Sequence, residues 1–364
     1  MTSSKPINIG LIGCGRVSQS RHLPCLQWLP AFQVAALADV DRDCLNRVAD
    51  RFQVSKRYGD YQALLAEPTL DAVAICLPAA AHVQAAMLAL RADKHVFIEK
   101  PLSLCQDEAE TLIEAAATCR KKVMVGFNLR WHRHILRARK ILQQGLLGPI
   151  KMVRFLFTTS IGHSLIVPEW KKKRRQGGGV LVENAVHCFD LLRFLFACEV
   201  EDIYVQSHSA SWDDETAAVT CRLGNGILAA GQLSETTSDC KDMEIYGENG
   251  SLRISLYRFD GIELLPVGRF PGDVRTRLNS IVNSLKNLPQ ALPHILRGGE
   301  LQASFYAEWK SFADCINSGH PAQCGLQDGL QALRVSLAAV HSAVVGQPVK
   351  VSQAPRNIEA AIAG

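Results

Sequence analysis

The first third of the chain alternates short apolar runs with stretches of helical character, and this alternation restricts the possible folds more than any other feature. The apolar runs occupy residues 7–13, 32–39, 71–78, 95–101 and 121–127. Helical stretches are expected between them, at 19–29, 41–52, 83–91 and 106–120. Apolar strands that alternate with helices are typical of a parallel sheet that helices cover on both faces. The sequence therefore predicts an α/β fold whose first part contains a parallel sheet.

The pattern changes after about residue 129. A long strand is expected at 151–160, and six shorter strand candidates follow between residues 201 and 266. Gly224-Asn225-Gly226 predicts a hairpin turn between two of them. Helices are expected at 130–144, 180–196, 302–317 and 326–345. Successive strands with tight turns predict a large open, mostly antiparallel sheet, so we expect a first domain of residues 1–126 and a second α/β domain of residues 127–364.

A glycine-rich turn joins the first expected strand to the first expected helix. Its sequence is Gly13-Cys14-Gly15-Arg16-Val17-Ser18, the dinucleotide fingerprint with serine in place of the third glycine. Gly13 permits a tight turn, and Gly15 lets the backbone approach a pyrophosphate at the positive end of the helix. The candidate cofactor-binding residues in this turn are Gly13, Gly15, Arg16 and Val17.

The second expected strand ends at Asp39. An acidic side chain at this place accepts hydrogen bonds from the ribose hydroxyls of adenosine and repels a 2′-phosphate. This favours NAD as the cofactor, although Arg42 lies close by in the sequence and NADP is therefore not excluded. The alternative is that Asp39 is an ordinary turn residue at the end of a strand.

Composition excludes several classes of protein. The 364 residues carry a formal net charge of +5, too weakly basic for a nucleic-acid-binding protein. The twelve cysteines are scattered without a C-x-x-C pair, and with no secretory leader we expect a reducing, cytoplasmic setting. No apolar run is long enough to span a membrane. No metal is expected, because the spacing of His132 and His134 puts them on different helix faces and no further ligand motif accompanies them.

Four motifs together resemble the glucose–fructose oxidoreductase, inositol dehydrogenase and MocA (Gfo/Idh/MocA) family. They are the fingerprint at 13–18, Leu77-Pro78 with His82, Glu99-Lys100-Pro101, and GGGVLVENAVHCFD at 177–190. Their order and spacing extend to about residue 351. The resemblance implies a Rossmann domain followed by an α/β domain with an open sheet. It also implies an enzyme that uses NAD or NADP to oxidise or reduce a hydroxyl of a sugar, cyclitol or related polyol.

The resemblance implies roles for individual residues. Lys100 corresponds to the family lysine that reaches both nicotinamide and substrate, and His187 corresponds to the histidine with the acid/base role. Glu183 stands where many members carry aspartate, four residues before that histidine. The residues expected near the nicotinamide and its ribose are Pro78, His82 and Glu99.

The chemistry of hydride transfer agrees with these roles. Removing a hydride from a carbinol requires loss of the hydroxyl proton, so a base must lie within hydrogen-bond reach of that oxygen. Histidine titrates in the required range, and an ammonium group can stabilise the developing negative charge. Glu183, His187 and Asp190 fall at i, i+4 and i+7 of an expected apolar helix and would share one face. The alternatives are a strand-end lysine for Lys100, a core histidine for His187, and a structural cap or ion pair for Asp190.

Further side chains are candidates for substrate contacts, Asp190 among them. Asn128 and Arg130 directly follow the last apolar run of the first domain and could contact substrate or cofactor. Trp170 precedes five consecutive cations, Lys171 to Arg175. Such a run is commonly only solvated. It could also bind an anionic substrate, such as a uronic acid, a sugar phosphate or a nucleotide-linked sugar.

Residues 275–299 form a separate helical insert. Its apolar stripe consists of Leu278, Ile281, Val282, Leu285 and Leu288, and Pro289 and Pro293 are expected to break the helix. The stripe could cover the protein's own sheet, contact another subunit or, as the last choice, lie on a membrane surface. The open sheet also makes a homodimer or homotetramer the expected assembly.

The sequence thus predicts an NAD(P)-dependent oxidoreductase that acts on a carbohydrate-type substrate. Two other functions remain open. A redox-neutral NAD-dependent glycosidase or eliminase would use the same lysine and histidine, and a regulatory protein would bind the cofactor without turnover. The presence of both Lys100 and His187 favours an enzyme over a regulatory protein.

Overall fold

The computed structural model describes residues 5–164 and 167–363, which form two compact units. Unit 1 contains residues 5–128 and 305–333, and unit 2 contains residues 129–304 and those from 334 onward. The segment 305–333, expected in the second domain, therefore packs with the first. An aromatic contact explains this packing, because Trp309 stacks on Phe97 of the parallel sheet at a centroid distance of 4.3 Å. Such a long-range contact leaves no mark in the local pattern.

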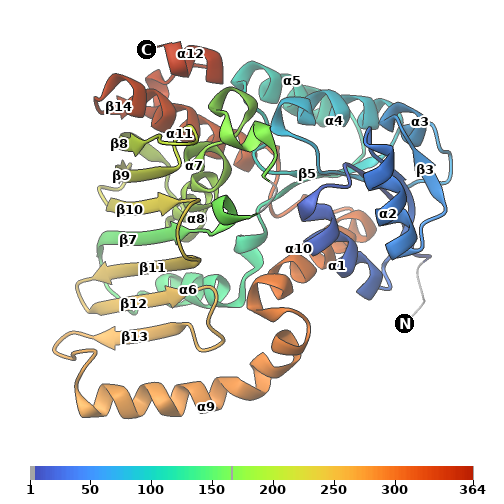
Figure 1. Ribbon diagram of the computed structural model, residues 1–364. Helices are drawn as coiled ribbons and strands as arrows, with labels where there is room; N and C mark the ends of the chain where they lie inside the picture. The colour runs from blue at the N-terminus through green and yellow to red at the C-terminus, as the bar shows by residue number, and fades with distance from the viewer. Residues whose placement is uncertain (1–4, 165–166, 364) are drawn as a thin grey trace. The chain divides into compact units, whose positions relative to one another are not determined.

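Unit 1 is built on a six-stranded parallel sheet in the order β3-β2-β1-β4-β5-β6 (Figure 1). Its strands are β1 (Ile7–Ile12), β2 (Phe32–Ala38), β3 (Lys56–Tyr58), β4 (Ala72–Ile75), β5 (His95–Glu99) and β6 (Val123–Gly126). All residues of β4 and β6 are buried, as expected for strands covered on both faces. The strand order reverses between β1 and β4, and sheets of this kind bind ligands at the carboxyl ends of the strands beside such a reversal.

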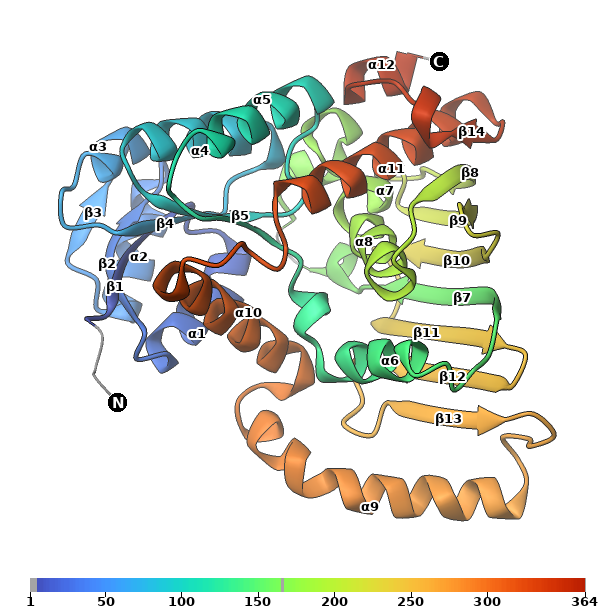
Figure 2. The same cartoon turned by 180° about the vertical axis from the view of Figure 1, so that it is seen from behind.

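Helices connect these strands. They are α1 (Leu23–Trp28), α2 (Arg42–Phe52), α3 (Tyr61–Leu65), α4 (His82–Arg91) and α5 (Gln106–Ala117). Helix α10 (Gly299–Ser318) does not connect strands of this sheet but belongs to the unit from Phe305 onward. Helices α4 and α5 lie on one face of the sheet, and α1 and α10 lie on the other (Figures 1 and 2). The predicted parallel α/β arrangement is confirmed. The short β3 and α3 were not foreseen, since three to five residues carry too little periodicity.

Unit 2 is built on an eight-stranded sheet in the order β13-β12-β11-β7-β10-β9-β8-β14. Its strands are β7 (Ile150–Thr158), β8 (Val200–His208), β9 (Thr216–Leu223), β10 (Leu228–Ser234), β11 (Cys240–Gly247), β12 (Gly250–Ser255), β13 (Ile262–Pro266) and β14 (Val349–Lys350). Strands β7 and β10 pair in parallel, and the other described pairs are antiparallel. The prediction of an open, mostly antiparallel sheet is therefore confirmed.

The helices of unit 2 lie mainly on one side of this sheet. They are α6 (Arg133–Gln143), α7 (Val180–Glu183), α8 (Ala185–Phe196), α9 (Val274–Leu296) and α12 (Ile358–Ala363), together with the part of α11 (Leu326–Val345) from Arg334 onward. Helices α6 and α8 cover one face, whereas α9 runs beside the edge strand β13 (Figures 1 and 2). The prediction that Pro289 and Pro293 break α9 was wrong, because the helix continues to Leu296. A proline removes one backbone hydrogen bond, and a helix can continue past that loss with a kink.

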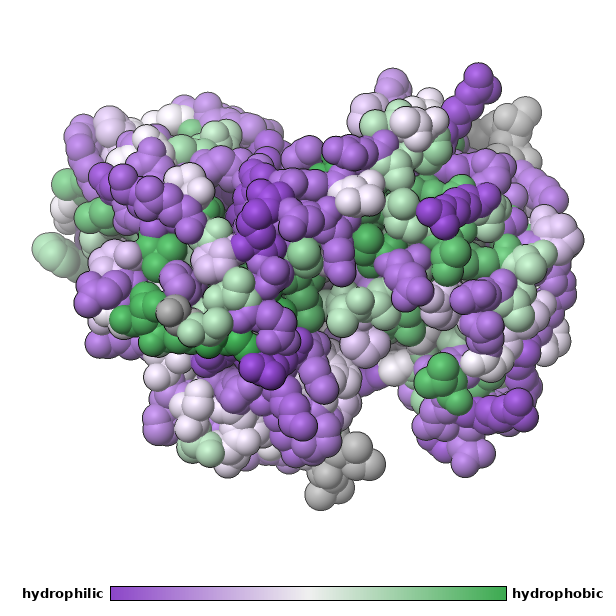
Figure 3. Space-filling model, turned by 90° about the horizontal axis from the view of Figure 1, so that it is seen from above, coloured by the Kyte–Doolittle hydropathy of each residue, from purple (hydrophilic) through white to green (hydrophobic). Residues whose placement is uncertain are grey.

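One face of the molecule resembles the surface of an ordinary folded protein. The face in Figure 3 carries hydrophilic side chains with hydrophobic ones scattered between them. Isolated exposed apolar residues of this kind are normal. In the described part of the chain, no helix is long and apolar enough to cross a membrane. All twelve cysteines lie in described residues and are free.

Candidate active site

The turn after β1 leaves no room for a side chain at Gly13. The backbone of Gly13 has a φ of +97°, and an added Cβ would lie 2.5 Å from the carbonyl oxygen of Cys76. The hydroxyl of Ser18 donates a hydrogen bond of 2.6 Å to the carbonyl oxygen of Gly13 and closes the turn. Gly15 is exposed, and apart from its own atoms and those of its two chain neighbours no described atom lies within 4 Å of the place its Cβ would take. The turn is therefore closed by the protein at Gly13 and open to a ligand at Gly15.

Asp39 holds this turn from the end of β2. Its carboxylate accepts the N–H of Cys14 at 2.6 Å and the N–H of Asp41 at 2.9 Å. A carboxylate has about four acceptor positions, so Asp39 can still accept hydrogen bonds from ribose hydroxyls. The open backbone at Gly15 and the fixed carboxylate of Asp39 fit NAD. Arg16 is exposed and Val17 is half-buried at the start of the helical segment.

His82 joins the ends of two neighbouring strands. Its Nδ1 lies 2.8 Å from the carbonyl oxygen of Pro101, and its Nε2 lies 2.8 Å from that of Leu77. Burial lowers the pKa of His82 below 6.5, and a neutral ring has one N–H and donates to only one of these two oxygens. Through these contacts His82 positions the turn that carries Lys100. Pro78 is exposed, four residues before His82.

A series of hydrogen bonds, which sequence reasoning missed, fixes the end of β5. The indole N–H of Trp309 donates to Nδ1 of His22 at 3.1 Å, and Nε2 of His22 lies 2.8 Å from Oε1 of Glu99. The other carboxylate oxygen of Glu99 accepts the backbone N–H of Lys100 at 3.1 Å. Because Nδ1 of His22 accepts from Trp309, the ring proton is on Nε2 and points to Glu99.

Glu99 is a buried anion at the end of this series. Burial favours its neutral form, but the hydrogen bond from His22 and the charge of Lys100 hold the pKa of Glu99 below 4.5. Lys100 therefore follows a carboxylate whose position is fixed from two sides. His22 and Trp309 are 287 residues apart, and the only available sequence signal was the apolar helical spacing of Phe305 and Trp309.

Glu183 and His187 lie on either side of a helix break in unit 2. Helix α7 ends at Glu183 and α8 begins at Ala185, so the single helix expected at 180–196 is two helices. Asn184 lies at the break and donates its side-chain amide to the carbonyl oxygen of Phe157 at 3.4 Å. Asparagine side chains that bond to the backbone compete with helix formation. His187 follows on α8 and is 7% exposed.

Three predicted site residues come together in front of this break. The ammonium group of Lys171 lies 2.5 Å from a carboxylate oxygen of Glu183 and 5.2 Å from the centroid of the Trp170 ring. The side chains of Lys171 and Glu183 are 12% and 19% exposed, so the pair is largely shielded from water. A Cβ at Gly178 would collide with the carbonyl oxygen of Lys171, which explains the glycine at that position.

Two other candidates, Arg130 and Asp190, bind each other. Nε of Arg130 lies 2.8 Å from Oδ2 of Asp190, and Nη2 lies 2.5 Å from Oδ1. Both side chains are at most 5% exposed. This bidentate pair ties α8 to the segment that precedes α6, which favours the structural interpretation of Asp190. Asn128 is buried in unit 1, two residues after β6.

Most of the basic segment is also paired. Lys172 lies 2.7 Å from Glu169, and Arg174 contacts both carboxylate oxygens of Asp214 at 2.6 and 2.7 Å. Arg175 lies 3.4 Å from Glu359. With the Lys171–Glu183 pair, four of the five cations face a carboxylate of the same unit. Among the described residues, no group of His, Cys, Asp or Glu side chains is arranged to hold a metal ion.

The parallel sheet and its glycine turn indicate a dinucleotide-binding protein, and comparison with known sequences gives the family. Residues 7–127 match the family model described as "Oxidoreductase family, NAD-binding Rossmann fold" of Gfo/Idh/MocA. Residues 135–253 match the C-terminal domain model of the same family. The chain belongs to the Gfo/Idh/MocA family of NAD-dependent oxidoreductases, as the four motifs predicted.

Individual relatives extend over nearly the whole chain. An uncharacterised oxidoreductase, YrbE of Bacillus subtilis (strain 168), is 28% identical over 357 residues, which cover 96% of this chain and 97% of the relative. Myo-inositol 2-dehydrogenase of Thermotoga maritima is 26% identical over 356 residues, with 95% and 99% covered. The crystal structure of WlbA dehydrogenase from Bordetella pertussis, in complex with NADH and UDP-GlcNAcA, has a TM-score of 0.80 at 20% identity and covers 96% of this chain and 99% of that one.

Proposed function

We propose that the chain transfers a hydride between NAD and a hydroxyl-bearing carbon of a sugar or cyclitol. The proposal rests mainly on the position of Lys100. This residue directly follows a buried strand of the NAD-binding sheet and the Glu99 carboxylate, which His22 fixes. Carboxyl ends of such strands are where ligands of this fold bind. The similarity to a myo-inositol 2-dehydrogenase over nearly the whole chain supports the substrate class.

We assign the proton chemistry to side chains of this chain. Bound NAD supplies the nicotinamide that exchanges the hydride. His187 accepts the hydroxyl proton in the oxidative direction and returns it in the reductive one. The ammonium group of Lys100 stabilises the negative charge that develops on the oxygen. Glu183 is paired with Lys171 and so acts by positioning rather than by taking the proton.

A neutral substrate suits the site better than an anionic one. Four of the five cations expected to hold an anion already face carboxylates of the same unit. Using these cations for a substrate anion would break existing ion pairs, including the shielded bidentate pair of Arg174 with Asp214. We therefore infer a neutral polyol, in place of the uronic acid or nucleotide-linked sugar considered from the sequence.

The test is a substrate screen with NAD in which both product and absorbance at the nicotinamide band are recorded. Neutral sugars and cyclitols are compared with the matching uronates and nucleotide sugars. We expect absorbance to change in proportion to product, with the neutral compounds preferred. Product without a net absorbance change would identify a redox-neutral glycosidase or eliminase. NAD binding without turnover of any compound would favour a regulatory protein, and preference for the anions would contradict the neutral substrate.

We further propose a cytoplasmic homo-oligomer, a dimer or tetramer. Twelve free cysteines suit a reducing compartment. Met152 on β7 and Leu228 on β10 are neighbours in register and are 49% and 58% exposed, so this part of the sheet offers an apolar surface for another subunit. Sedimentation equilibrium of the wild type and of Leu228→Glu tests the assembly. We expect the wild type to associate and the variant to dissociate at lower protein concentration.

A further inference from the structure

Helix α9 turns its polar side toward its own unit and its apolar side to solvent. The residues that are buried or half-buried recur at helical spacing and are Thr276, Ser280, Ser284, Asn287, Ala291 and His294. On the opposite side, Val274, Leu278, Ile281 and Leu285 are between 57% and 74% exposed. The stripe continues through Leu288, Leu292 and Ile295, which are 42% to 52% exposed. This is the reverse of a helix that covers its own sheet, so that expectation for the stripe was wrong.

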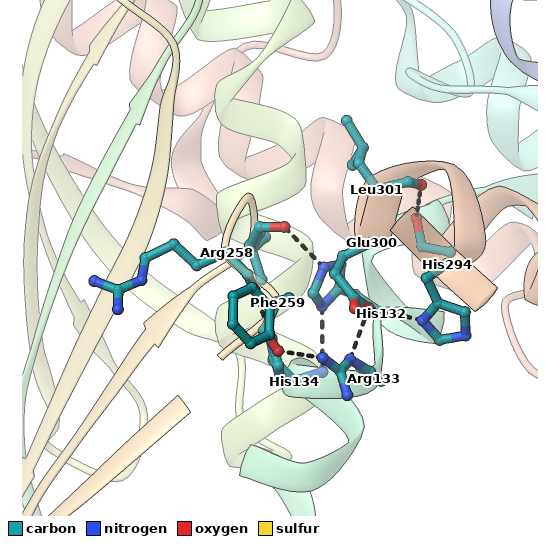
Figure 4. Close-up of polar contacts among 10 residues, drawn as sticks. His132, Arg133, His134, Arg258, Phe259, His294, Glu300 and Leu301 are labelled. Carbon is teal, nitrogen blue, oxygen red and sulfur yellow. Dashed lines mark hydrogen bonds and ion pairs between the residues drawn. The ribbon is translucent and has the colours of Figure 1, made fainter. Parts of the chain in front are cut away.

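Polar contacts with other segments hold α9 in this orientation at two places, and its N-terminus is capped locally. Asp273 caps the helix and accepts the N–H of Thr276 at 2.6 Å. The hydroxyl of Ser284 donates to Asp260 at 2.7 Å. Near the C-terminal end, the ring of His294 lies 3.0 Å from Glu300, whose carboxylate also binds Arg133 of α6 (Figure 4). The side of α9 that faces unit 2 is therefore matched to it by hydrogen bonds and charge.

The space between α9 and the sheet is polar as well. A cavity of about 260 Å³ is lined by Arg277, Ser280 and Asn283 of α9 and by charged residues of β11 to β13, among them Glu244 and Arg253. Turning the helix over would place the leucines against these charges and desolvate them. The apolar stripe is thus an outward-facing surface of the folded unit.

The exposed surface around the stripe is basic. Val267 and Phe270, each 70% exposed, extend the apolar surface into the preceding loop. Residues 274–299 contain three arginines and one lysine but no aspartate or glutamate. All four of these cations are exposed, and Arg277 also lines the polar cavity. Neither family model extends over α9, since the matched residues are 7–127 and 135–253.

We propose that the apolar stripe of α9 docks onto the surface of a membrane that contains anionic lipids. A helix with a leucine- and isoleucine-rich face flanked by arginine and lysine lies in the plane of such a surface, with its apolar side among the acyl chains. The cations meet the negative potential of the lipid headgroups. A second copy is a poorer partner for this helix, because a twofold contact of α9 with α9 would bring like charges together without a carboxylate from either helix.

The test uses the full chain and vesicles of two compositions, pure phosphatidylcholine and phosphatidylcholine with about one quarter phosphatidylglycerol. We expect co-sedimentation with the anionic vesicles, weak binding to the neutral ones, and release by salt. Ile281→Ser with Leu285→Ser should weaken binding at least tenfold, and Arg275→Gln with Lys286→Gln should weaken it about fivefold for each cation removed. Asn279→Ser with Gln290→Ser alters exposed uncharged positions of the same helix and should leave binding unchanged.

Hydrogen–deuterium exchange of the wild type supplies a result that needs no variant. We expect residues 274–296 to become protected when anionic vesicles are added. The proposal is overturned if the folded wild type does not bind anionic vesicles at low salt, or if the stripe and cation variants bind as well as the wild type. It is also overturned if light scattering shows an assembly that the Ile281→Ser, Leu285→Ser variant dissociates while vesicle binding is unchanged, because a second copy then covers the stripe.

Discussion

At the scale of residues, two glycines of the same turn have different physical tasks. Gly13 adopts a backbone conformation that side chains disfavour and lies against the end of β4, whereas Gly15 faces open space. The first glycine therefore serves the protein's own packing, and the second leaves room for a ligand. Substitution of Gly13 should therefore affect mainly the stability of the fold, and substitution of Gly15 mainly the binding of the cofactor.

We expect Gly13→Ala to lower the free energy of unfolding by about 1–3 kcal/mol, because the new Cβ meets the carbonyl oxygen of Cys76. Gly15→Ala should change it by less than about 0.5 kcal/mol and raise the Kd for NAD at least tenfold. Denaturant unfolding and calorimetric titration with NAD measure both quantities. Wild-type affinity of Gly15→Ala for NAD would show that the cofactor does not approach this backbone.

His132 links folding to pH through the start of α6. Its Nδ1 accepts the N–H of His134 at 3.2 Å and its Nε2 donates to the carbonyl oxygen of Leu256 at 3.0 Å. Burial and the neighbouring His134 lower the pKa of His132 from 6.5 to about 3. The unfolded chain therefore binds this proton at a higher pH than the folded chain does, so stability is complete above pH 6.5 and falls as the pH drops toward 3.

At pH 5 we expect His132 to contribute a loss of about 2 kcal/mol relative to pH 7.5. Denaturant unfolding at the two pH values measures the loss. His132→Asn is the matched control, because it keeps an acceptor for the helix cap but does not titrate. The variant should lose less stability on acidification than the wild type does. Equal losses would show that His132 does not contribute to the loss of stability at low pH.

At the scale of elements, sequence periodicity predicted those helices and strands whose formation depends mainly on the local sequence. Except for the short β3 and β14, the strands of both sheets follow from apolar patterns, and the hairpin at Gly224-Asn225-Gly226 follows from its turn residues. The break at Asn184 and the continuity of α9 through two prolines do not, because each depends on how backbone groups are satisfied by neighbours. The orientation of α9 likewise depends on polar contacts with Asp260 and Glu300, which no periodicity reveals.

The Arg130–Asp190 pair joins two elements, and its role can be separated from substrate binding. Asp190→Ala leaves a buried guanidinium without its carboxylate and should lower the free energy of unfolding by about 3–5 kcal/mol. Arg130→Met with Asp190→Leu removes both charges and should recover most of this loss. A structural pair predicts that the folded double variant retains NAD-dependent activity. Loss of activity in a fully folded double variant would assign substrate binding to this pair.

At the scale of the whole molecule, the sequence predicted two domains of the right kinds but not all of their residues. Trp309 of α10 belongs to the first unit, where it supports His22 and, through it, Glu99. The motifs Gly13 to Ser18 and Glu99 to Pro101 were visible because their function needs particular residues at fixed local spacing. The contacts that position Glu99 were not visible, since His22 and Trp309 are 287 positions apart in the sequence.

The proposed chemistry uses the side chains of Lys100 and His187. The most direct measurement is single-turnover formation of reduced cofactor by the wild type, Lys100→Met and His187→Asn, with a polyol identified in the screen and NAD affinity measured in parallel. We predict that all three proteins bind NAD within about threefold of one another, while the chemical step of each variant slows at least a hundredfold. Wild-type rates of reduction in either folded variant would contradict the proposed site.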